Sequence, residues 1–307
     1  MKLDEMQKNL LKEIAGFEKI PEGAFNIRNN GELLSRNSTA DIEIETKKDK
    51  PGINIYIKAD TKNQRVDIPV ILSKAGIVDI TYNEFFVGDN ADVLIVAGCG
   101  IHNAGHDKAE HDGIHTFHIG KNARVKYVEK HYGEGDGVGE RVLNPTTVIE
   151  IDEGGYLEMD SSQIKGVDST DRKTTATLKD RAILIVNEKI YTHGKQVAKT
   201  DFIINLDGKD CGTHVTSRSV ARDESRQVFT SQMNGNNKCS GHTECDAILM
   251  DKANVEAIPK IRANDIDAKL IHEAAIGKIA GEQLDKLMTL GLTEKEAEEK
   301  IINGFLR

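Results

Sequence analysis

Cysteine and aromatic residues are scarce in this sequence. The four cysteines, Cys99, Cys211, Cys239 and Cys245, are too few and too widely spaced for a disulfide framework in a chain of 307 residues. Cys239 and Cys245 also miss the C-x2-C spacing of zinc ribbons and ferredoxins, so any metal site has to be assembled by the fold. The absence of tryptophan and the aromatic content of 5% argue against a sugar-binding cleft, which relies on aromatic platforms.

Long apolar segments and an excess of basic residues are also absent. No apolar run reaches roughly eighteen residues, and the N-terminus is acidic and amphipathic, so we expect a cytoplasmic protein that does not enter a membrane. Fifty acidic and 41 basic side chains give a net charge of −9, which argues against a nucleic-acid partner.

Motifs of common enzymes are missing as well. The sequence has no G-x-x-x-x-G-K-[ST] motif, and the glycine-rich stretch Gly133–Gly139 is acidic and lacks a lysine for a phosphate. It also has no G-x-S-x-G motif for a serine nucleophile. We therefore expect that the chain does not hydrolyse ATP itself and that any ATPase has to be supplied by a partner subunit.

Hydrophobic periodicity predicts a helix at the start of the chain. Apolar residues recur there at spacings of three and four, which is typical of an amphipathic helix. They are Leu3, Met6, Leu10, Ile14 and Phe17. A polar, Asn-rich stretch at 26–39 then ends the helical pattern, so we expect an N-terminal helical segment over residues 1–35.

From about residue 40 the apolar pattern alternates with a period of two, which predicts β-strands. A polar turn, a small residue and an apolar strand recur with the small residue at Ala91, Ala123, Gly155 and Ala182, at intervals of 32, 32 and 27 residues. Near-constant spacing of this kind is typical of a β-solenoid, whose coils stack on one another. A β-sandwich is the alternative. We predict a mainly β protein with a solenoid core over residues 36–273.

The last part of the sequence, residues 274–307, returns to a helical pattern. Its apolar stripe ends before Gly291, a suitable C-cap, and Thr293 to Glu296 has the sequence of a capping box. The apolar residues that we expect to contact a partner are Ile276, Ile279, Leu284, Leu287, Ile301 and Phe305. The segment either covers the end of the solenoid or binds a partner.

Candidate metal ligands gather near the C-terminus. Cys245 lies in Gly241-His-Thr-Glu-Cys-Asp, and His272 and Glu273 follow in the next predicted strands. Thiolate, imidazole and carboxylate are the ligand types that iron accepts, so we interpret these residues as a cluster-handling site. If His272 and Glu273 occupy one strand, their side chains point to opposite faces, so one of them is not expected to be a ligand.

A second group of candidate ligands lies upstream. Cys99 and His102 have a usable metal spacing, and His106 follows in a stretch rich in Gly, Asn and Asp. The histidines continue with His111, His115 and His118. The stretch is a metal-binding loop, a solvated turn or an inward-facing row of histidines. Weaker candidates for metal binding are Cys239, His242 and His214, whereas Cys211 is expected in the core.

Several separated motifs of the C-terminal region resemble the core of the SufB/SufD family, the scaffold subunits of the SUF iron–sulfur cluster assembly system. They are Glu244-Cys-Asp-Ala-Ile-Leu, Ala268-Lys-Leu-Ile-His-Glu-Ala, Gly277-Lys-Ile-Ala-Gly-Glu-Gln-Leu, Gly291-Leu and Ile302-Asn-Gly-Phe. The motifs occur in order over residues 205–306. The turn-and-strand pattern extends the resemblance to residues 40–306 and implies a right-handed parallel β-helix.

The resemblance also implies roles for particular residues. Cys245 matches the cysteine that receives sulfur or binds the nascent cluster, Glu273 matches a proposed cluster ligand, and His272 matches its neighbour. The segment 274–306 resembles the docking region for the ATP-hydrolysing SufC subunit. The chain looks like a minimal, archaeal-type SufB-like scaffold, and this resemblance implies a protein that is not itself an enzyme.

The implied cofactor is a transient iron–sulfur cluster of the 4Fe-4S type, with 2Fe-2S as the alternative. The implied partners are a SufC-like ABC-type ATPase, a second copy of the chain in a complex of two scaffold and two ATPase subunits, a sulfur donor and apo-protein acceptors. Two other functions remain open: a β-helix carbohydrate-active enzyme, and a purely structural interaction platform.

Overall fold

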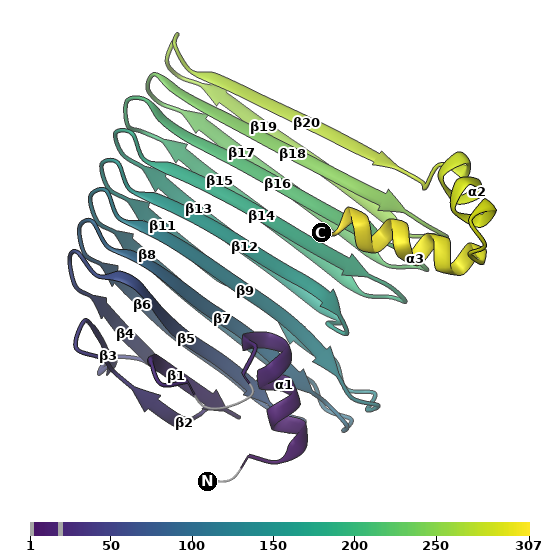
Figure 1. Cartoon of the computed structure of the whole chain (residues 1–307), viewed down its shortest axis with the longest axis horizontal. Coiled ribbons are helices and arrows are strands. Elements are labelled where there is room, and N and C mark those ends of the chain that lie inside the picture. Colours follow the sequence, from purple (N-terminus) through teal and green to yellow (C-terminus); the bar gives the residue numbers. More distant parts are fainter. Residues whose placement is uncertain (1–2, 18–20) are drawn as a thin grey trace.

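The chain forms a parallel β-solenoid that is flanked by helices (Figure 1). The computed structural model describes residues 3–17 and 21–307. Strands contain 59% of the described residues and build about 8 turns. The predicted mainly β solenoid with a short N-terminal helix and C-terminal helices is therefore confirmed. In the described residues, no helix is both long enough and apolar enough to cross a membrane.

Two long sheets form the walls of the solenoid, and we call them sheet A and sheet B. In order of pairing, sheet A contains β2 (Glu32–Asn37), β1 (Ala24–Asn29), β5 (Lys62–Leu72), β7 (Asp92–His102), β9 (Arg124–Glu134), β12 (Tyr156–Lys165), β14 (Ile183–Thr192), β16 (Cys211–Ala221), β18 (Cys239–Leu249) and β20 (Lys269–Gly277). Sheet B contains β19 (Asn254–Ala263), β17 (Arg226–Gly235), β15 (Val197–Leu206), β13 (Ser169–Leu178), β10 (Arg141–Leu143), β8 (Ala109–Ile119), β6 (Val78–Val87), β4 (Gly52–Ile57) and β3 (Ile42–Thr46), and β11 (Thr146–Ile151) also pairs with β8 and β13.

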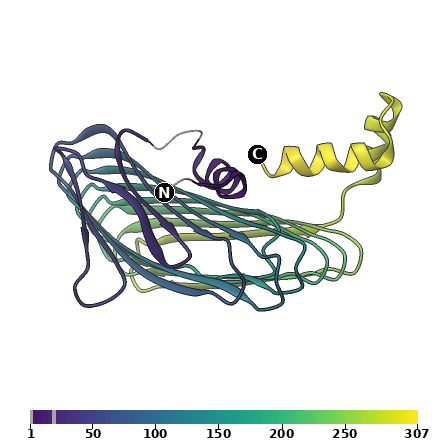
Figure 2. The ribbon, with the colours of Figure 1, turned by 90° about the horizontal axis from the view of Figure 1, so that it is seen from below.

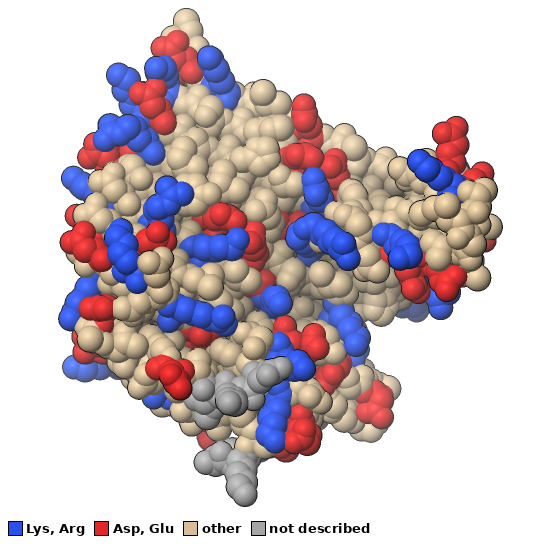
Figure 3. All heavy atoms as spheres, in the orientation of Figure 1, with Lys and Arg blue, Asp and Glu red and all other residues tan. Residues whose placement is uncertain are grey.

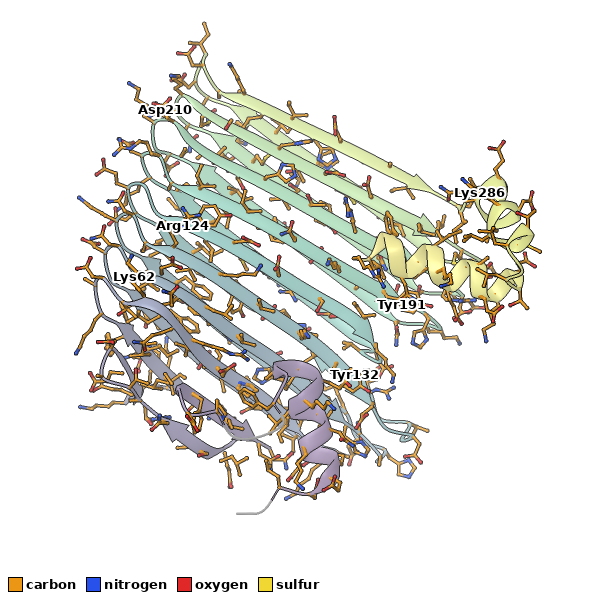
Figure 4. All side chains as sticks on the ribbon, viewed as in Figure 1. Lys62, Arg124, Tyr132, Tyr191, Asp210 and Lys286 are labelled. Carbon is orange, nitrogen blue, oxygen red and sulfur yellow. The ribbon has the colours of Figure 1, made fainter. Side chains whose placement is uncertain are left out.

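The recurring small residues lie at the corners that lead into sheet A. Ala91, Ala123 and Ala182 are fully buried there. The preceding residues adopt the left-handed conformation, with φ of 58° at Asn90 and 54° at Asn122. Asparagine and glycine tolerate this region best, because a Cβ atom otherwise approaches the backbone. The repeated sequence pattern therefore reflects a repeated corner, at the edge where Lys62, Arg124 and Asp210 are seen in Figure 4.

Helix α1 (Glu5–Ala15) lies on the outer face of sheet A. Asp4 and Gln7 form its capping box, and Gly16 ends it in the left-handed conformation. Leu10 and Ile14 are fully buried against the sheet. A Cβ atom at Gly98 of β7 would lie 2.7 Å from the backbone oxygen of Ile14, so this close approach requires glycine.

The expected helical segment 1–35 contains only this one helix among its described residues. Strands β1 and β2 already begin at Ala24 and Glu32, and they pair as an antiparallel hairpin. The Asn-rich stretch thus supplies turn residues for a hairpin whose buried strand joins sheet A, and β20 extends beyond the expected core boundary at residue 273.

Helices α2 (Gly281–Thr289) and α3 (Glu294–Phe305) follow β20. The predicted capping box is present, because Thr293 and Glu296 exchange hydrogen bonds at the start of α3. Figure 2 shows α3 on the same side of the solenoid as α1, while α2 extends past the strands. In Figure 4, Tyr132 lies near α1 and Tyr191 lies near α3.

The two ends of the solenoid differ. At the N-terminal end the antiparallel pair β3 and β4 covers the interior, and Ile42 and Ile55 are fully buried. At the C-terminal end, β19 and β20 are the last strands, and their outer edges have no partner strand among the described residues. Ile261 and Ile276 are 45% and 43% exposed at this end. In the view of Figure 3, positive and negative side chains are interspersed over the surface.

Candidate functional site

Cys245 faces the interior of the solenoid, one strand from its open end. It lies on β18, where it is in register with Ser217 of β16 and Ala274 of β20. Its exposed fraction is 1%. Burial, with a smaller effect from the negative charge of Glu188, raises the pKa of the Cys245 thiol to about 12. Since the thiolate is the nucleophile and the metal ligand, the site is closed in this state.

His272 shares this interior face. It is in register with Thr243, which precedes Cys245 by two residues on β18 and also points inward. Neither ring nitrogen of His272 has a hydrogen-bond partner among the residues described. Burial, and then the nearby His242, lowers the pKa of the His272 imidazole. A neutral imidazole on the same face as a thiol can act as a ligand of iron.

Glu273 faces the outside. Its register partner is Glu244, and its Oε2 atom lies 3.3 Å from Nε2 of His242. The prediction that His272 and Glu273 point to opposite faces of one strand is therefore confirmed. The pleat places Cys245 and His272 on the same inner face of the sheet and Glu273 on the opposite face.

A buried ionic cluster, which we did not predict from the sequence, continues the interior row that contains Cys245. The row runs through Glu129, Ser161, Glu188, Ser217 and Cys245, each in register with the next. Glu188 accepts hydrogen bonds from Ser217 at 2.8 Å and from a threonine of β15 at 2.9 Å. Leu184 and Val186 are apolar residues two positions apart in β14, and continuing their alternation would have predicted that the side chain of residue 188 also faces the interior.

Arg172 of β13 connects the two acidic members of this row. Its Nη1 lies 2.5 Å from Oε2 of Glu129, and its Nε lies 3.6 Å from Oε1 of Glu188. Burial raises the pKa of Glu129, but the charge of Arg172, together with the charge and hydrogen bond of His131, outweighs burial and holds this pKa well below its usual range. At Glu188 burial prevails, so the pKa of that carboxyl is raised. The interior therefore holds one strong ion pair and one weakly compensated acid.

The upstream histidine-rich stretch is mainly strand rather than loop. Cys99 points inward on β7, whereas His102 lies on the other face and contacts Glu134 at 3.3 Å. His106 is exposed in the following turn. The structure therefore does not bring Cys99, His102 and His106 together, because a spacing of three places two strand residues on opposite faces.

His111 and His115, by contrast, form an inward-facing row. They border a small cavity of about 20 Å³ beside Cys99. Gly113, which lies between them and has no side chain, also lines this cavity. Across residues 3–17 and 21–307, no three His, Cys, Asp or Glu side chains are arranged as a metal-binding group.

The remaining cysteine and histidine candidates also lie on two different faces of sheet A, the cysteines inside and the histidines outside. Cys211 and Cys239 are register partners, both buried, and Cys211 is in the core as predicted. His242 and His214 are neighbours on the outer face, with ring centroids 4.8 Å apart. Cys239 and His242 are therefore not part of one site.

The predicted partner-binding residues are partly used within the chain. Ile279 and Phe305 pack with Ile302, Leu306 and Val220 in an apolar cluster between α3 and the solenoid. Helix α2 contributes no buried residue. The residues left accessible on and around α2 are Ile276, Leu284, Leu287, Met288 and Leu290.

Comparison with known proteins identifies a family and several relatives of this chain. Residues 71–305 match the family model for "SUF system FeS cluster assembly, SufBD core domain". An iron–sulfur cluster assembly SufBD family protein of Methanocaldococcus jannaschii is 32% identical over 232 residues, which cover 75% of this chain and 71% of that protein. A SufBD family protein of Pyrococcus horikoshii is 26% identical over 89% of this chain and 84% of its own length. The assembly protein SufB of Bacillus subtilis is 31% identical over 96 residues, 30% of this chain and 21% of that protein.

Proposed function

We propose that this chain, which belongs to the SufBD family of the SUF iron–sulfur cluster assembly system, is a scaffold on which clusters are built before transfer to apo-proteins. The observation that carries the proposal is the shared inner face of Cys245 and His272, next to the open end of the solenoid. Thiolate and neutral imidazole are both ligands of iron in clusters. The nascent cluster, of the 4Fe-4S type with 2Fe-2S as the alternative, is cargo of the protein.

The chemistry of Cys245 requires that the site opens. A thiolate accepts sulfane sulfur from a donor persulfide by attacking its outer sulfur, and the donor departs as a thiolate. With its pKa raised to about 12, Cys245 ionises when its surroundings become more polar. On the side of the open end, Cys245 is covered by its register partner Ala274. Alanine is the smallest side chain at the inward-facing positions of β20, so a modest shift of this strand would expose the sulfur.

A SufC-like ATPase is the proposed source of this shift. The accessible apolar residues of α2 offer it a docking surface, because α3 is already held against the solenoid. The residues after α3 are held against the solenoid as well, because Lys189 donates a hydrogen bond to the backbone oxygen of Arg307. Closure of an ATPase pair on α2 would pull on β20 directly, since α2 follows this strand after a short connection.

A second copy of the chain is the proposed cover of the open end. Among the strands that the structure describes, none pairs with the outer edges of β19 and β20 there, and Ile261 and Ile276 are exposed beside them. Such edges favour pairing with another chain. Pairing two copies end to end would enclose His272 and cover Cys245. In this assignment the chain itself catalyses no reaction, and its cytoplasmic location stays a prediction.

The proposal is tested by anaerobic co-purification of the chain with its ATPase subunit, followed by iron and sulfide analysis and a visible spectrum. The wild-type complex is expected to be brown. Cys245→Ala should lose the iron and the sulfide but keep the fold and the ATPase. Cys211→Ala is the matched control, because it removes a buried core cysteine on the neighbouring strand β16.

Two results would contradict the scaffold function. A Cys245→Ala complex with the iron and sulfide content of the wild type would remove this residue from the assembly site. A colourless wild-type complex after reconstitution with iron and sulfide would return the chain to the class of structural interaction platforms.

A further inference from the structure

The candidate ligands near the C-terminus lie on two faces of one sheet. Cys245 and His272 point into the solenoid, whereas His242 and Glu273 point outward from the same two strands. A single metal centre cannot use both pairs, because the backbone of the sheet lies between them. The outer pair, His242 and Glu273, therefore cannot belong to the interior site at Cys245.

The outer pair belongs to a larger group of metal-ligating side chains. His214 of β16 packs its ring edge-to-face on His242, with centroids 4.8 Å apart. Glu244 follows His242 on the same outward side of β18 and is in register with Glu273. Two imidazoles and two carboxylates thus occupy adjacent outward positions on three neighbouring strands.

The spacing of the outer pair matches two ligands of one ion. Nε2 of His242 lies 3.3 Å from Oε2 of Glu273. Two donor atoms that are each about 2.1 Å from a metal, at a right angle, are about 3 Å apart. Nitrogen and oxygen donors of this kind bind divalent first-row metals such as ferrous iron. We propose that His242, Glu273 and Glu244 form a ferrous-iron site on the outer face of sheet A, distinct from the interior site at Cys245.

The third donor has to move into place. Among the described residues, no three such side chains already surround one point as a metal centre does. Glu273 is 66% exposed, so its carboxylate is free to reorient. Glu244 is its register neighbour and can reach the same ion by side-chain rotation, while water completes the coordination shell.

A second pair of acidic residues on the outer face of sheet A serves as a comparison, because a lysine neutralises it. Glu158 and Asp160 of β12 have the same spacing as Glu244 and Asp246, and both contact Nζ of Lys126 at 2.9 Å. Within the described residues, Glu244 and Asp246 form no ion pair with a lysine or an arginine. Arg218 of β16 is the register partner of Asp246, whereas Glu244 lies between Thr216 and Glu273 in register and follows His242 on its own strand, so its neighbours suit a metal ion better than an ammonium group.

The inference rests on the proposed scaffold function and extends it to the substrate iron. The outer site lies on β18 and on the edge strand β20, so iron bound there is separated from Cys245 by the thickness of the sheet. Nitrogen and oxygen donors hold ferrous iron without competing with thiolate and sulfide for the final cluster. Iron would then pass around the free edge of β20 when the interior opens.

The test measures ferrous-iron binding by the full chain under anaerobic conditions, in a Cys245→Ala background that removes the interior thiol. Binding is followed by calorimetry and by competition with a colorimetric ferrous chelator. Mn²⁺ is the redox-stable probe for electron paramagnetic resonance. Cys245→Ala should bind about one ferrous ion per chain. Adding His242→Ala or Glu273→Gln should weaken binding at least tenfold, whereas adding Glu158→Gln should leave it unchanged.

The outcomes separate this inference from the scaffold function. If His242→Ala, with an unchanged circular dichroism spectrum, binds iron as the parent does, the outer pair is only an ion pair and the inference is wrong. If Cys245→Ala itself shows no saturable binding, the inference is equally wrong, even if the cysteine proves essential for the cluster. If iron binding depends on His242 while Cys245→Ala still carries a normal cluster, the outer site stands and the scaffold role of Cys245 falls.

Discussion

Cys245 of β18 and Ala274 of β20 are register partners that both face the interior of the solenoid. Because Ala274 lies on the last strand and has a small side chain, Cys245 is separated from the open end by a thin layer of protein. The thiol is nevertheless buried, and its pKa is raised to about 12. The site is therefore close to a surface but chemically closed.

We expect Cys245 of the isolated chain to react slowly with iodoacetamide. At pH 8, a thiol with this pKa is ionised to about one part in ten thousand, compared with roughly a quarter for an ordinary cysteine. Labelling followed by mass spectrometry should show at least a hundredfold slower modification than in urea. Addition of the ATPase with ATP should speed up labelling of Cys245, with Cys211 as the unreactive internal control. Equal rates in the native and unfolded chain would show that the site is already open.

We expect Ile261→Lys to convert a dimer to a monomer. The side chain is exposed beside the unpaired edge of β19, and a charge there would be buried without a partner in the dimer. Light scattering after gel filtration measures the mass. Ile164→Lys is the matched control, because Ile164 has the same exposed fraction of 45% but lies on β12, away from the open end. Loss of the dimer in both variants would argue against pairing through this end.

Helices α2 and α3 are expected to respond differently to mutation. Leu290, which is 75% exposed next to α2, should tolerate a change to Glu with less than about 0.5 kcal/mol of lost stability. Leu290→Glu should still weaken ATPase binding at least tenfold in a titration, because it places a charge on the docking surface. Ile302→Glu should instead detach α3 from the solenoid, and hydrogen exchange along α3 would detect this. Full ATPase affinity in Leu290→Glu would move the docking surface elsewhere.

Arg172→Met is expected to destabilise the solenoid by about 3–5 kcal/mol, because it leaves Glu129 and Glu188 buried without a counter-charge. Urea denaturation followed by circular dichroism measures the loss. Arg124→Met is the control, since Arg124 stacks on the ring of Tyr156 at the surface and should cost less than about 1 kcal/mol. Combining Arg172→Met with Glu129→Gln and Glu188→Gln should recover part of the stability. A small effect of Arg172→Met alone would mean that water reaches the interior.

His115 is expected to make the protein sensitive to acid. It is buried beside Tyr127, with 6% of its surface exposed, and burial lowers the pKa of its imidazole from 6.5 to about 4. Its neutral form is favoured in the folded state, so this contribution to stability is complete above pH 6.5 and decreases as the pH falls towards 4. The loss is about 3 kcal/mol over this window. His115→Gln should have a flatter dependence of unfolding free energy on pH, and an unchanged slope would exclude His115 as its source.

The architecture could be predicted from local features of the sequence. Alternating apolar residues define the strands. The small residues at positions 91, 123, 155 and 182 each follow a residue that turns the chain, so each sequence repeat corresponds to one coil of the solenoid. The helix caps at Asp4 and Thr293 are equally local. The hairpin of β1 and β2 was missed, because its Asn-rich sequence lacks the alternation of a strand and is stabilised by pairing with β5.

The candidate site could be predicted only in part. Sequence alone determined the types of ligand, their order, and the opposite orientation of His272 and Glu273, since side chains alternate along any strand. Only the tertiary structure decided which coils stack in register. That stacking joined Glu129, Arg172 and Glu188 into one buried cluster. It also placed Cys245 inside the solenoid while His242 met Glu273 outside. Contacts between strands about 30 residues apart depend on the length of each coil and on its corners, and no local pattern specifies them.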